Sequence, residues 1–180
     1  MTTLQTERLT IRPWAEADRA AYVAINADPR VGEWLGGPFT EAETSAAFDR
    51  LMGPQPDEQW TWAGARKADG AIVGMFMLRR VTGDDHPRAG EVEVGWRLAP
   101  AAWGHGYASE AARAIIAFGF SALDVDELVA FTATTNLRSQ AVMRRIGLER
   151  DERRDFEHPR LAKGHPLRAH VVFAVGRAGR

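Results

Sequence analysis

Hydrophobic and polar positions alternate along parts of the chain and recur at helical spacing along others. In the segment GEVEVGWRLAP, residues 90–100, every second residue is apolar, which is the period of a β-strand. The apolar side of this strand holds Val92, Val94, Trp96 and Leu98. Directly after it, small and apolar residues between 108 and 123 recur with the 3.6-residue period of a helix. The pattern therefore predicts a strand that runs through a short loop into a long helix.

The rest of the chain divides into further strands and helices by the same criteria. Strands are predicted at 9–13, on either side of Asp69-Gly70 within 59–81 as a two-residue hairpin, at 126–136, 148–156 and 168–175. Helices are predicted at 15–28, at 41–52 after a Thr40 cap, and at 136–148 between an Asn136 cap and Gly147. The order β-α-α-β-β-β-α-β-α-β-β predicts an α/β fold, more closely an α+β mixed sheet covered by helices.

Composition restricts the class of protein. A chain of 180 residues, 45% hydrophobic and 26% charged, suits one domain spanning residues 1–180. The net charge of −1 argues against a nucleic-acid or membrane partner. The chain has no cysteine, its N-terminus lacks the apolar core of a signal peptide, and a cytoplasmic location is expected.

The stretch WGHGYASEA, residues 103–111, indicates an anion site. It joins the amphipathic strand to the long helix, whose first backbone N–H groups are unpaired and carry partial positive charge. Gly104 and Gly106 leave room for a phosphate to approach the backbone, although a tight turn would also need glycines here. The stretch lacks the Gly-Lys-Ser/Thr of a nucleoside triphosphate site, and Ser109 stands where a dinucleotide-binding motif has its third glycine.

Three segments in order give the chain a resemblance to a known family. They are TERLTIRPWAEADRAAYVAI near the start, EVEVGWRLAPAAWGHGYASEA in the middle and NLRSQAVMRRIGL near the end. Together they resemble the GNAT superfamily of N-acetyltransferases, in particular its branch similar to the ribosomal-protein alanine acetyltransferases. The resemblance implies a single GNAT-like domain with a mostly antiparallel sheet of about seven strands, one splayed strand pair and about four helices.

The resemblance also implies acetyl-CoA as cosubstrate. Backbone amides of the loop would hold its pyrophosphate, and the end of the preceding strand would pair with its pantetheine arm, with two polar residues of the following helix start beside that arm. The loop residues are Trp103, Gly104, His105, Gly106, Tyr107 and Ala108, the strand residues are Trp96, Arg97 and Leu98, and the helix residues are Asn136 and Ser139. No spacing of His, Asp or Glu indicates a metal, and none is expected.

The chain departs from the wider superfamily at two positions. Ala101 stands where many members have Gln or Arg before the first glycine. Met143 stands where many members have a tyrosine that protonates the departing thiolate, so another group must supply that proton. Ser139, on the same helix start as Asn136, is the predicted acid, and Asn136 is also a plain helix cap.

Acetyl transfer also needs a base that takes the proton of the attacking amine. Glu93 is the best candidate, working through water from the exposed polar face of its strand. Glu91 shares that face and competes with it, and a solvent-facing strand glutamate without a catalytic role is an equal alternative.

The leading hypothesis is direct attack of a primary amine on acetyl-CoA, the amine belonging to a small molecule or a peptide N-terminus. The alternative is a CoA-binding sensor or interaction module with little turnover. Candidate acceptor walls are the segment with Trp34 and Phe39 and the loop 155–170, whereas Trp60 and Trp62 favour the core. Whether the chain forms a homodimer stays open.

Overall fold

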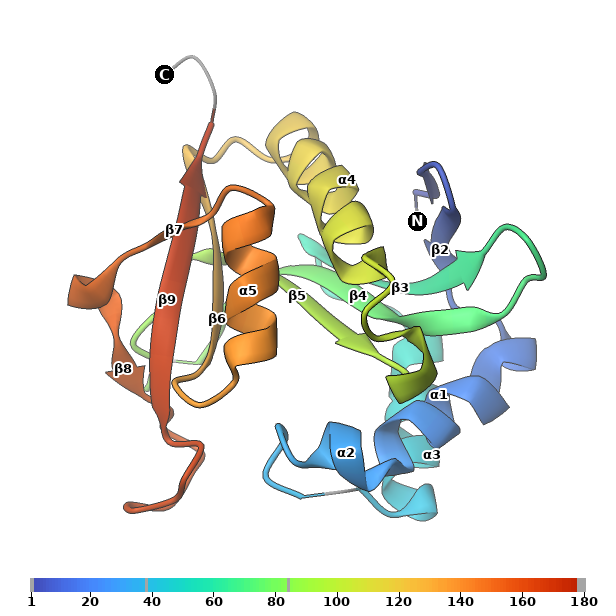
Figure 1. Ribbon diagram of the computed structural model, residues 1–180, viewed down its shortest axis with the longest axis horizontal. Helices are drawn as coiled ribbons and strands as arrows, with labels where there is room; N and C mark the ends of the chain where they lie inside the picture. Colours follow the sequence, from blue (N-terminus) through green and yellow to red (C-terminus); the bar gives the residue numbers. More distant parts are fainter. Residues whose placement is uncertain (1, 38, 84, 178–180) are drawn as a thin grey trace.

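The computed structural model describes residues 2–37, 39–83 and 85–177, and its strands form one sheet (Figure 1). The strand order is β1-β2-β3-β4-β5-β6-β9-β7, with β8 also paired to β9. The strands are β1 (Leu4–Gln5), β2 (Leu9–Pro13), β3 (Gln59–Arg66), β4 (Ile72–Arg80), β5 (Val92–Leu98), β6 (Glu127–Ala133), β7 (Glu149–Arg150), β8 (Phe156–Glu157) and β9 (Ala169–Gly176). The helices are α1 (Arg19–Ala27), α2 (Pro29–Gly32), α3 (Glu41–Met52), α4 (Tyr107–Ala122) and α5 (Leu137–Arg145), with 3-10 turns η1 (Glu16–Asp18), η2 (Pro100–Ala102) and η3 (Glu152–Arg154). The mixed fold predicted from the sequence is confirmed, but the described residues form nine strands and five α-helices where about seven strands and about four helices were expected.

Helices cover both faces of the sheet. Trp62, on β3, is fully buried on the face that packs against α4, where it and Trp60 stack and both meet the Phe118 ring edge-on. Ala63, the next residue, faces Tyr22 of α1 and Phe48 of α3 on the other side. Because successive strand residues point to opposite faces, side chains of the same strand contribute to a hydrophobic core on each face of the sheet. The core assignment of both tryptophans is confirmed.

The strand pair β5–β6 departs from the rest of the sheet. All other neighbouring strands are antiparallel, whereas β5 and β6 are parallel and share a single register pair, Glu93 with Val129. Beyond that pair the two strands separate toward their carboxyl ends (Figure 1). The splayed pair implied by the resemblance is therefore present, and it is formed by these two strands.

Several local predictions need correction. The turn between β3 and β4 spans residues 67–71 instead of two residues, with the Gly70 amide bonded to the Arg66 carbonyl at 2.7 Å. The strand expected at 148–156 is interrupted by η3, because the Asp151 carboxylate caps that turn by accepting from the Arg153 amide. The short elements β1 and α2 carry too few residues to show a period in the sequence. No helix in the described ranges is both long and apolar enough to cross a lipid bilayer.

Candidate active site

The carboxyl ends of β5 and β6 bring two predicted site segments together. The chain leaves β5 through η2 into α4, and it leaves β6 through residues 134–136 into α5. The Arg138 guanidinium of α5 lies over the Trp103 ring of the first loop, 4.8 Å from its centroid. The glycine loop and the start of α5 are therefore neighbours at the point where the two strands separate.

The glycine loop has a backbone that other residues adopt only with strain. Gly104 and Gly106 have φ angles of 79° and 80°, in the left-handed region. Gly106 is the N-cap of α4, and no side chain caps the helix. The Trp103 indole nitrogen donates to the Leu98 carbonyl oxygen at 3.0 Å, which anchors the loop to the end of β5. The glycines predicted for backbone exposure thus stand where the turn requires them.

The N-terminal end of α4 presents unused hydrogen-bond donors. The helical hydrogen bonds of α4 begin at Glu110, whose backbone amide donates to the Gly106 carbonyl oxygen. The amides of Gly104, His105 and Gly106 have no acceptor within the described part of the chain. The buried Ser109 hydroxyl in the first turn also lacks a partner there. This end of the helix offers an electropositive set of donors.

An arginine from the start of the chain neutralises the one acid in that first turn and supports the loop. Arg8 binds Glu110 through its backbone amide and its guanidinium, both at 2.7 Å, and donates to the His105 carbonyl oxygen at 3.0 Å. Burial raises the pKa of Glu110, but hydrogen bonds from Thr6 and Arg8 outweigh this effect and keep the pKa below its usual value. Arg8 also lies over the Tyr107 ring. Sequence reasoning missed Arg8, whose only signal was its place in the TERL segment.

At the start of α5, the two predicted polar residues share one cap. The Asn136 side-chain oxygen accepts a hydrogen bond from the Ser139 amide at 3.1 Å, which confirms Asn136 as the helix cap. The Ser139 hydroxyl is partly exposed and has no hydrogen-bond partner among the described residues. Met143, in the position of the usual tyrosine, is 2% exposed and belongs to the main core.

The sequence predicted that Glu93, on the polar face of β5, is exposed to solvent, and the structure contradicts this. Glu93 is 5% exposed and forms an ion pair with Arg79 of β4 at 2.9 Å, a residue that lies opposite it in the register. Burial raises the pKa of the Glu93 carboxyl, and the Arg79 charge opposes this shift. The prediction of an exposed carboxylate was wrong, because the alternation of β5 identifies its two faces but does not show that the polar face is covered at Glu93.

Glu91 has a different environment. It lies before β5 and pairs with Arg88 at 3.2 Å and with Arg154 at 3.7 Å. Arg154 in turn binds Glu127 and Asp151. Glu91 is thus part of a charge network at the amino-terminal ends of β5 and β6.

On the same face, next to β6, three histidines gather with two phenylalanines. The rings of His158 and His170 are 5.0 Å apart, His86 lies 5.7 Å from His158, and all three contact Phe156. Burial and neighbouring charges lower the pKa of His158 to about 4, so it is neutral at physiological pH. No group of three or more acidic or histidine side chains in the described ranges, this cluster included, is arranged to hold a metal ion.

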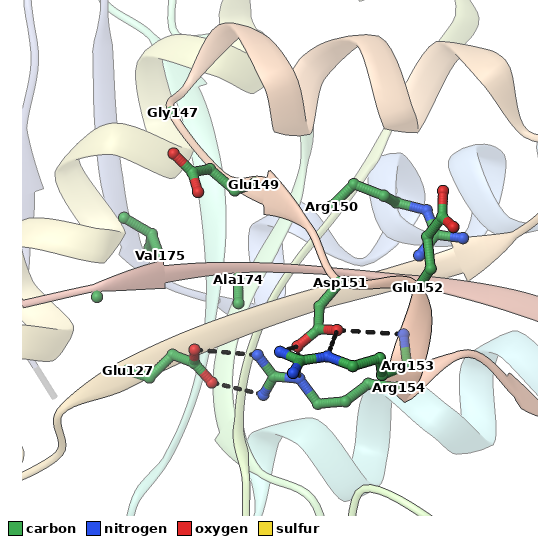
Figure 2. Close-up of a pocket in the computed structure, with 11 residues that line it drawn as sticks. Glu127, Gly147, Glu149, Arg150, Asp151, Glu152, Arg153, Arg154, Ala174 and Val175 are labelled. Atoms are coloured by element: carbon green, nitrogen blue, oxygen red, sulfur yellow. Dashed lines mark hydrogen bonds and ion pairs between the residues drawn. The ribbon is translucent and has the colours of Figure 1, made fainter.

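A surface hollow lies elsewhere, on the β6, β9 and β7 side of the sheet (Figure 2). It measures about 620 Å³ and is lined mainly by charged residues between 147 and 154. Several of its charges pair with each other: Arg154 binds Glu127 at 2.5 and 3.0 Å, and Asp151 accepts from Arg153 and Arg154. This hollow contains none of the predicted site residues.

Comparison with known proteins identifies the family. The acetyltransferase (GNAT) domain family matches residues 8–149, which include the elements from β2 to α5 and therefore the glycine loop and the start of α5. The chain belongs to the GNAT acetyltransferases. Enzymes of this family transfer an acetyl group from acetyl-CoA to an amine, and this GNAT chain is accordingly an N-acetyltransferase.

Similar proteins span fungi and bacteria. The chain is 35% identical over 153 residues to an FsC-acetyl coenzyme A-N(2)-transacetylase of Aspergillus fumigatus, covering 81% of this chain and 64% of that protein, so it spans less than two thirds of the fungal protein. It is 31% identical to the Bacillus subtilis protein named "Putative ribosomal N-acetyltransferase YdaF", covering 83% of this chain and 82% of that one. A solved GNAT-family acetyltransferase of Bacillus anthracis superposes with a TM-score of 0.79 at 24% identity, covering 97% and 98% of the two chains, and shows the same fold.

Proposed function

We propose that this enzyme moves the acetyl group of acetyl-CoA directly to a primary amine, with both reactants bound together. Bound acetyl-CoA would supply an activated acetyl thioester. The amides of residues 103–108 would hold its pyrophosphate, the end of β5 from Trp96 to Leu98 would pair with its pantetheine arm, and Asn136 and Ser139 would lie beside that arm. The absence of cysteine agrees with direct attack by the amine.

The observation that carries this proposal is the donor set at the N-terminal end of α4. The amides of Gly104, His105 and Gly106 have no acceptor in the described residues, and the buried Ser109 hydroxyl has none either. The only acid of the first turn, Glu110, is bound by Arg8. Phosphate oxygens would satisfy these donors, and the helix N-terminus would stabilise their negative charge. The chain's residues therefore fit the cosubstrate that the family implies.

The proton transfers can be assigned to two side chains. Glu93 has a pKa raised by burial, which makes it a stronger base than a solvent-exposed carboxylate, and it would take the proton that the amine loses on forming the new C–N bond. Ser139 has an unengaged hydroxyl and would donate a proton to the sulfur as the C–S bond breaks. The position of Glu93 supports it over Glu91, because Glu93 forms the single register pair of β5 with β6, beyond which the two strands separate, whereas Glu91 precedes β5.

The names of similar proteins do not decide whether the acceptor is a small-molecule amine or a peptide N-terminus. The fungal relative is named for N(2)-transacetylation of FsC, and the Bacillus subtilis relative for ribosomal N-acetylation. The segment with Trp34 and the loop 155–170 remain the proposed walls. They approach each other, since a Cβ on Gly36 would lie 3.7 Å from Leu161.

The test is turnover by the full chain. Purified protein is incubated with acetyl-CoA and a panel of small amines and peptides with free N-termini, and CoA release and acetylated product are measured. We expect at least one acceptor to give product, with initial rates that depend on both substrates in a ternary-complex pattern. Tight acetyl-CoA binding without product from any amine would instead support the sensor, and no binding at all would refute the assignment of the loop.

A further inference from the structure

The face of β5 turned away from α4 carries a guanidinium without an acidic partner. Arg97 donates a hydrogen bond to the Asn26 side-chain oxygen, and the Asn26 nitrogen donates to the Tyr22 carbonyl oxygen at 2.7 Å. Because that nitrogen is committed to Tyr22, the neutral amide oxygen is the atom that faces Arg97. Asn26 is 2% exposed, so this contact lies inside the protein.

The charges around Arg97 do not balance its own. Burial lowers its pKa, and its titratable neighbours are the Tyr22 phenol and a second cation, Arg79. Burial raises the pKa of Tyr22, which keeps the phenol neutral. The carboxylate of β5, Glu93, is bound to Arg79 at 2.9 Å. Within the described residues, no carboxylate forms an ion pair with Arg97.

The neighbouring surface beside β6 is mainly neutral and cationic, with Asp85 as an acid close to His86. The histidine cluster there has lowered pKa values, and Arg79 and Arg160 are among the charges that lower that of His158. Its rings pack on Phe131 and Phe156, which carry no charge. This face of the sheet is therefore cationic and aromatic around the end of β5.

A partly buried arginine that is left with a neutral partner costs free energy unless an anion completes its environment. Arginine stays protonated at any physiological pH, and its planar group binds a carboxylate through two parallel hydrogen bonds. Arg97 has five N–H donors, of which one has a partner in the described residues. These donors are suited to a ligand that carries a carboxylate.

We infer that Arg97 binds a carboxylate of the acceptor, so that the substrates are amines that also carry a carboxylate, as amino acids do. The inference rests on the proposed function. Arg97 and Glu93 are four residues apart on one face of β5, about 13 Å between Cα atoms. Between them lies Gly95, over which Met77 packs. The amine would lie toward Glu93 and the carboxylate toward Arg97, whereas a polyamine would bring further positive charge to a cationic face.

The experiment compares matched acceptors in which a carboxylate is replaced by its amide. The pairs are β-alanine and its amide, ornithine and ornithinamide, and the dipeptide Ala-Gly and its amide, with spermidine as a polycation. Each is assayed with wild type, Arg97→Gln, Arg97→Lys and the control Arg80→Gln, whose arginine pairs with Glu58 on the same sheet. The two members of each pair also differ in the pKa of the amine. Because this difference is the same for every variant, it cancels when the preference of wild type is compared with that of a variant. The dipeptide separates a peptide acceptor from a free amino acid.

We expect wild type to prefer the carboxylate member of at least one pair by about 10-fold or more in kcat/KM. Arg97→Gln should reduce that preference to about one, Arg97→Lys should retain part of it, and Arg80→Gln should retain all of it. Circular dichroism and acetyl-CoA affinity establish that the variants are folded. Equal use of both members of every pair by wild type, or an equal loss on both members in Arg97→Gln, would overturn the inference.

A second measurement separates this inference from the proposed function. The N-acetylated products of the three pairs are titrated into wild type and Arg97→Gln by calorimetry, which needs no turnover. A carboxylate preference that disappears in the variant supports the role of Arg97 even where no acceptor is acetylated. Binding of both members alike, or of neither, would overturn it.

Discussion

The two sides of the proposed site differ in the groups that they offer to a ligand. On the α4 side, the loop offers backbone amides, and its geometry depends on two glycines with positive φ angles. On the other side of β5, the site offers charged side chains, Glu93 with Arg79 and Arg97 with Asn26. A backbone site tolerates many neighbouring side chains, whereas a side-chain site changes with each substitution. Under the proposed function, the first side would hold the common cosubstrate and the second would select the acceptor.

The largest effect is expected from Gly106→Glu. The substitution forces a side chain into a φ of 80° and puts a negative charge at the end of α4 where we place the pyrophosphate. Acetyl-CoA affinity should fall at least about 1000-fold, or about 4 kcal/mol, by calorimetry. Gly147→Glu is the matched control, because Gly147 also has a positive φ, of 90°, and open space, but follows the C-cap at the far end of α5. Retained affinity in Gly106→Glu would refute the assignment of the loop.

The second largest effect is expected on the side of the site that consists of charged side chains. Glu93→Gln removes the proposed base and should lower kcat/KM about 100-fold. In wild type, activity should rise with pH through the Glu93 pKa, which burial holds above the usual glutamate range, because only the carboxylate accepts a proton. The variant should lose this limb of the pH–rate profile. The same raised pKa favours the protonated folded state, so the contribution of Glu93 to stability should decrease as pH rises through that range.

Glu91→Gln provides the control for this prediction. Its carboxylate belongs to the network with Arg88 and Arg154, so its loss should leave the acidic limb of the profile in place. A limb that persists in Glu93→Gln and disappears in Glu91→Gln would reverse the assignment.

The backbone half of the site could be predicted because its determinants are local. Glycine spacing, the switch from strand to helix period and the caps at Thr40 and Asn136 all act over a few residues, and the structure has the loop, α4 and both caps at those places. The helix at 41–52 has the predicted bounds for the same reason.

The side-chain half could not be predicted because its contacts are distant in sequence. Arg97 meets Asn26 across 71 positions, and Arg8 meets Glu110 across 102. A period-two pattern separates the two faces of β5 but does not show what covers each face, which is why Glu93 was expected in solvent. Partners of this kind require the folded chain.

A smaller effect is expected at the start of α5, where backbone and side chain meet. Ser139→Ala should lower kcat about 10-fold, because the hydroxyl is the proposed proton donor, and should leave acetyl-CoA affinity nearly unchanged. The Asn136 cap uses the Ser139 amide and survives the substitution. Ser139→Thr keeps a hydroxyl and should restore part of the rate. An unchanged kcat in Ser139→Ala would mean that the proton comes from another group.

The smallest effect concerns Arg138, which lies over Trp103 and is exposed. Its charge stands beside the loop where we place the pyrophosphate, so Arg138→Ala should weaken acetyl-CoA binding about 3-fold at low salt, and the difference should shrink as added salt screens the charge. Arg145→Ala removes the same charge from the opposite end of α5 and should change affinity less. Equal effects of the two substitutions at every salt concentration would show that the loop depends on its backbone amides and on the overall charge of the protein, with no specific contribution from Arg138.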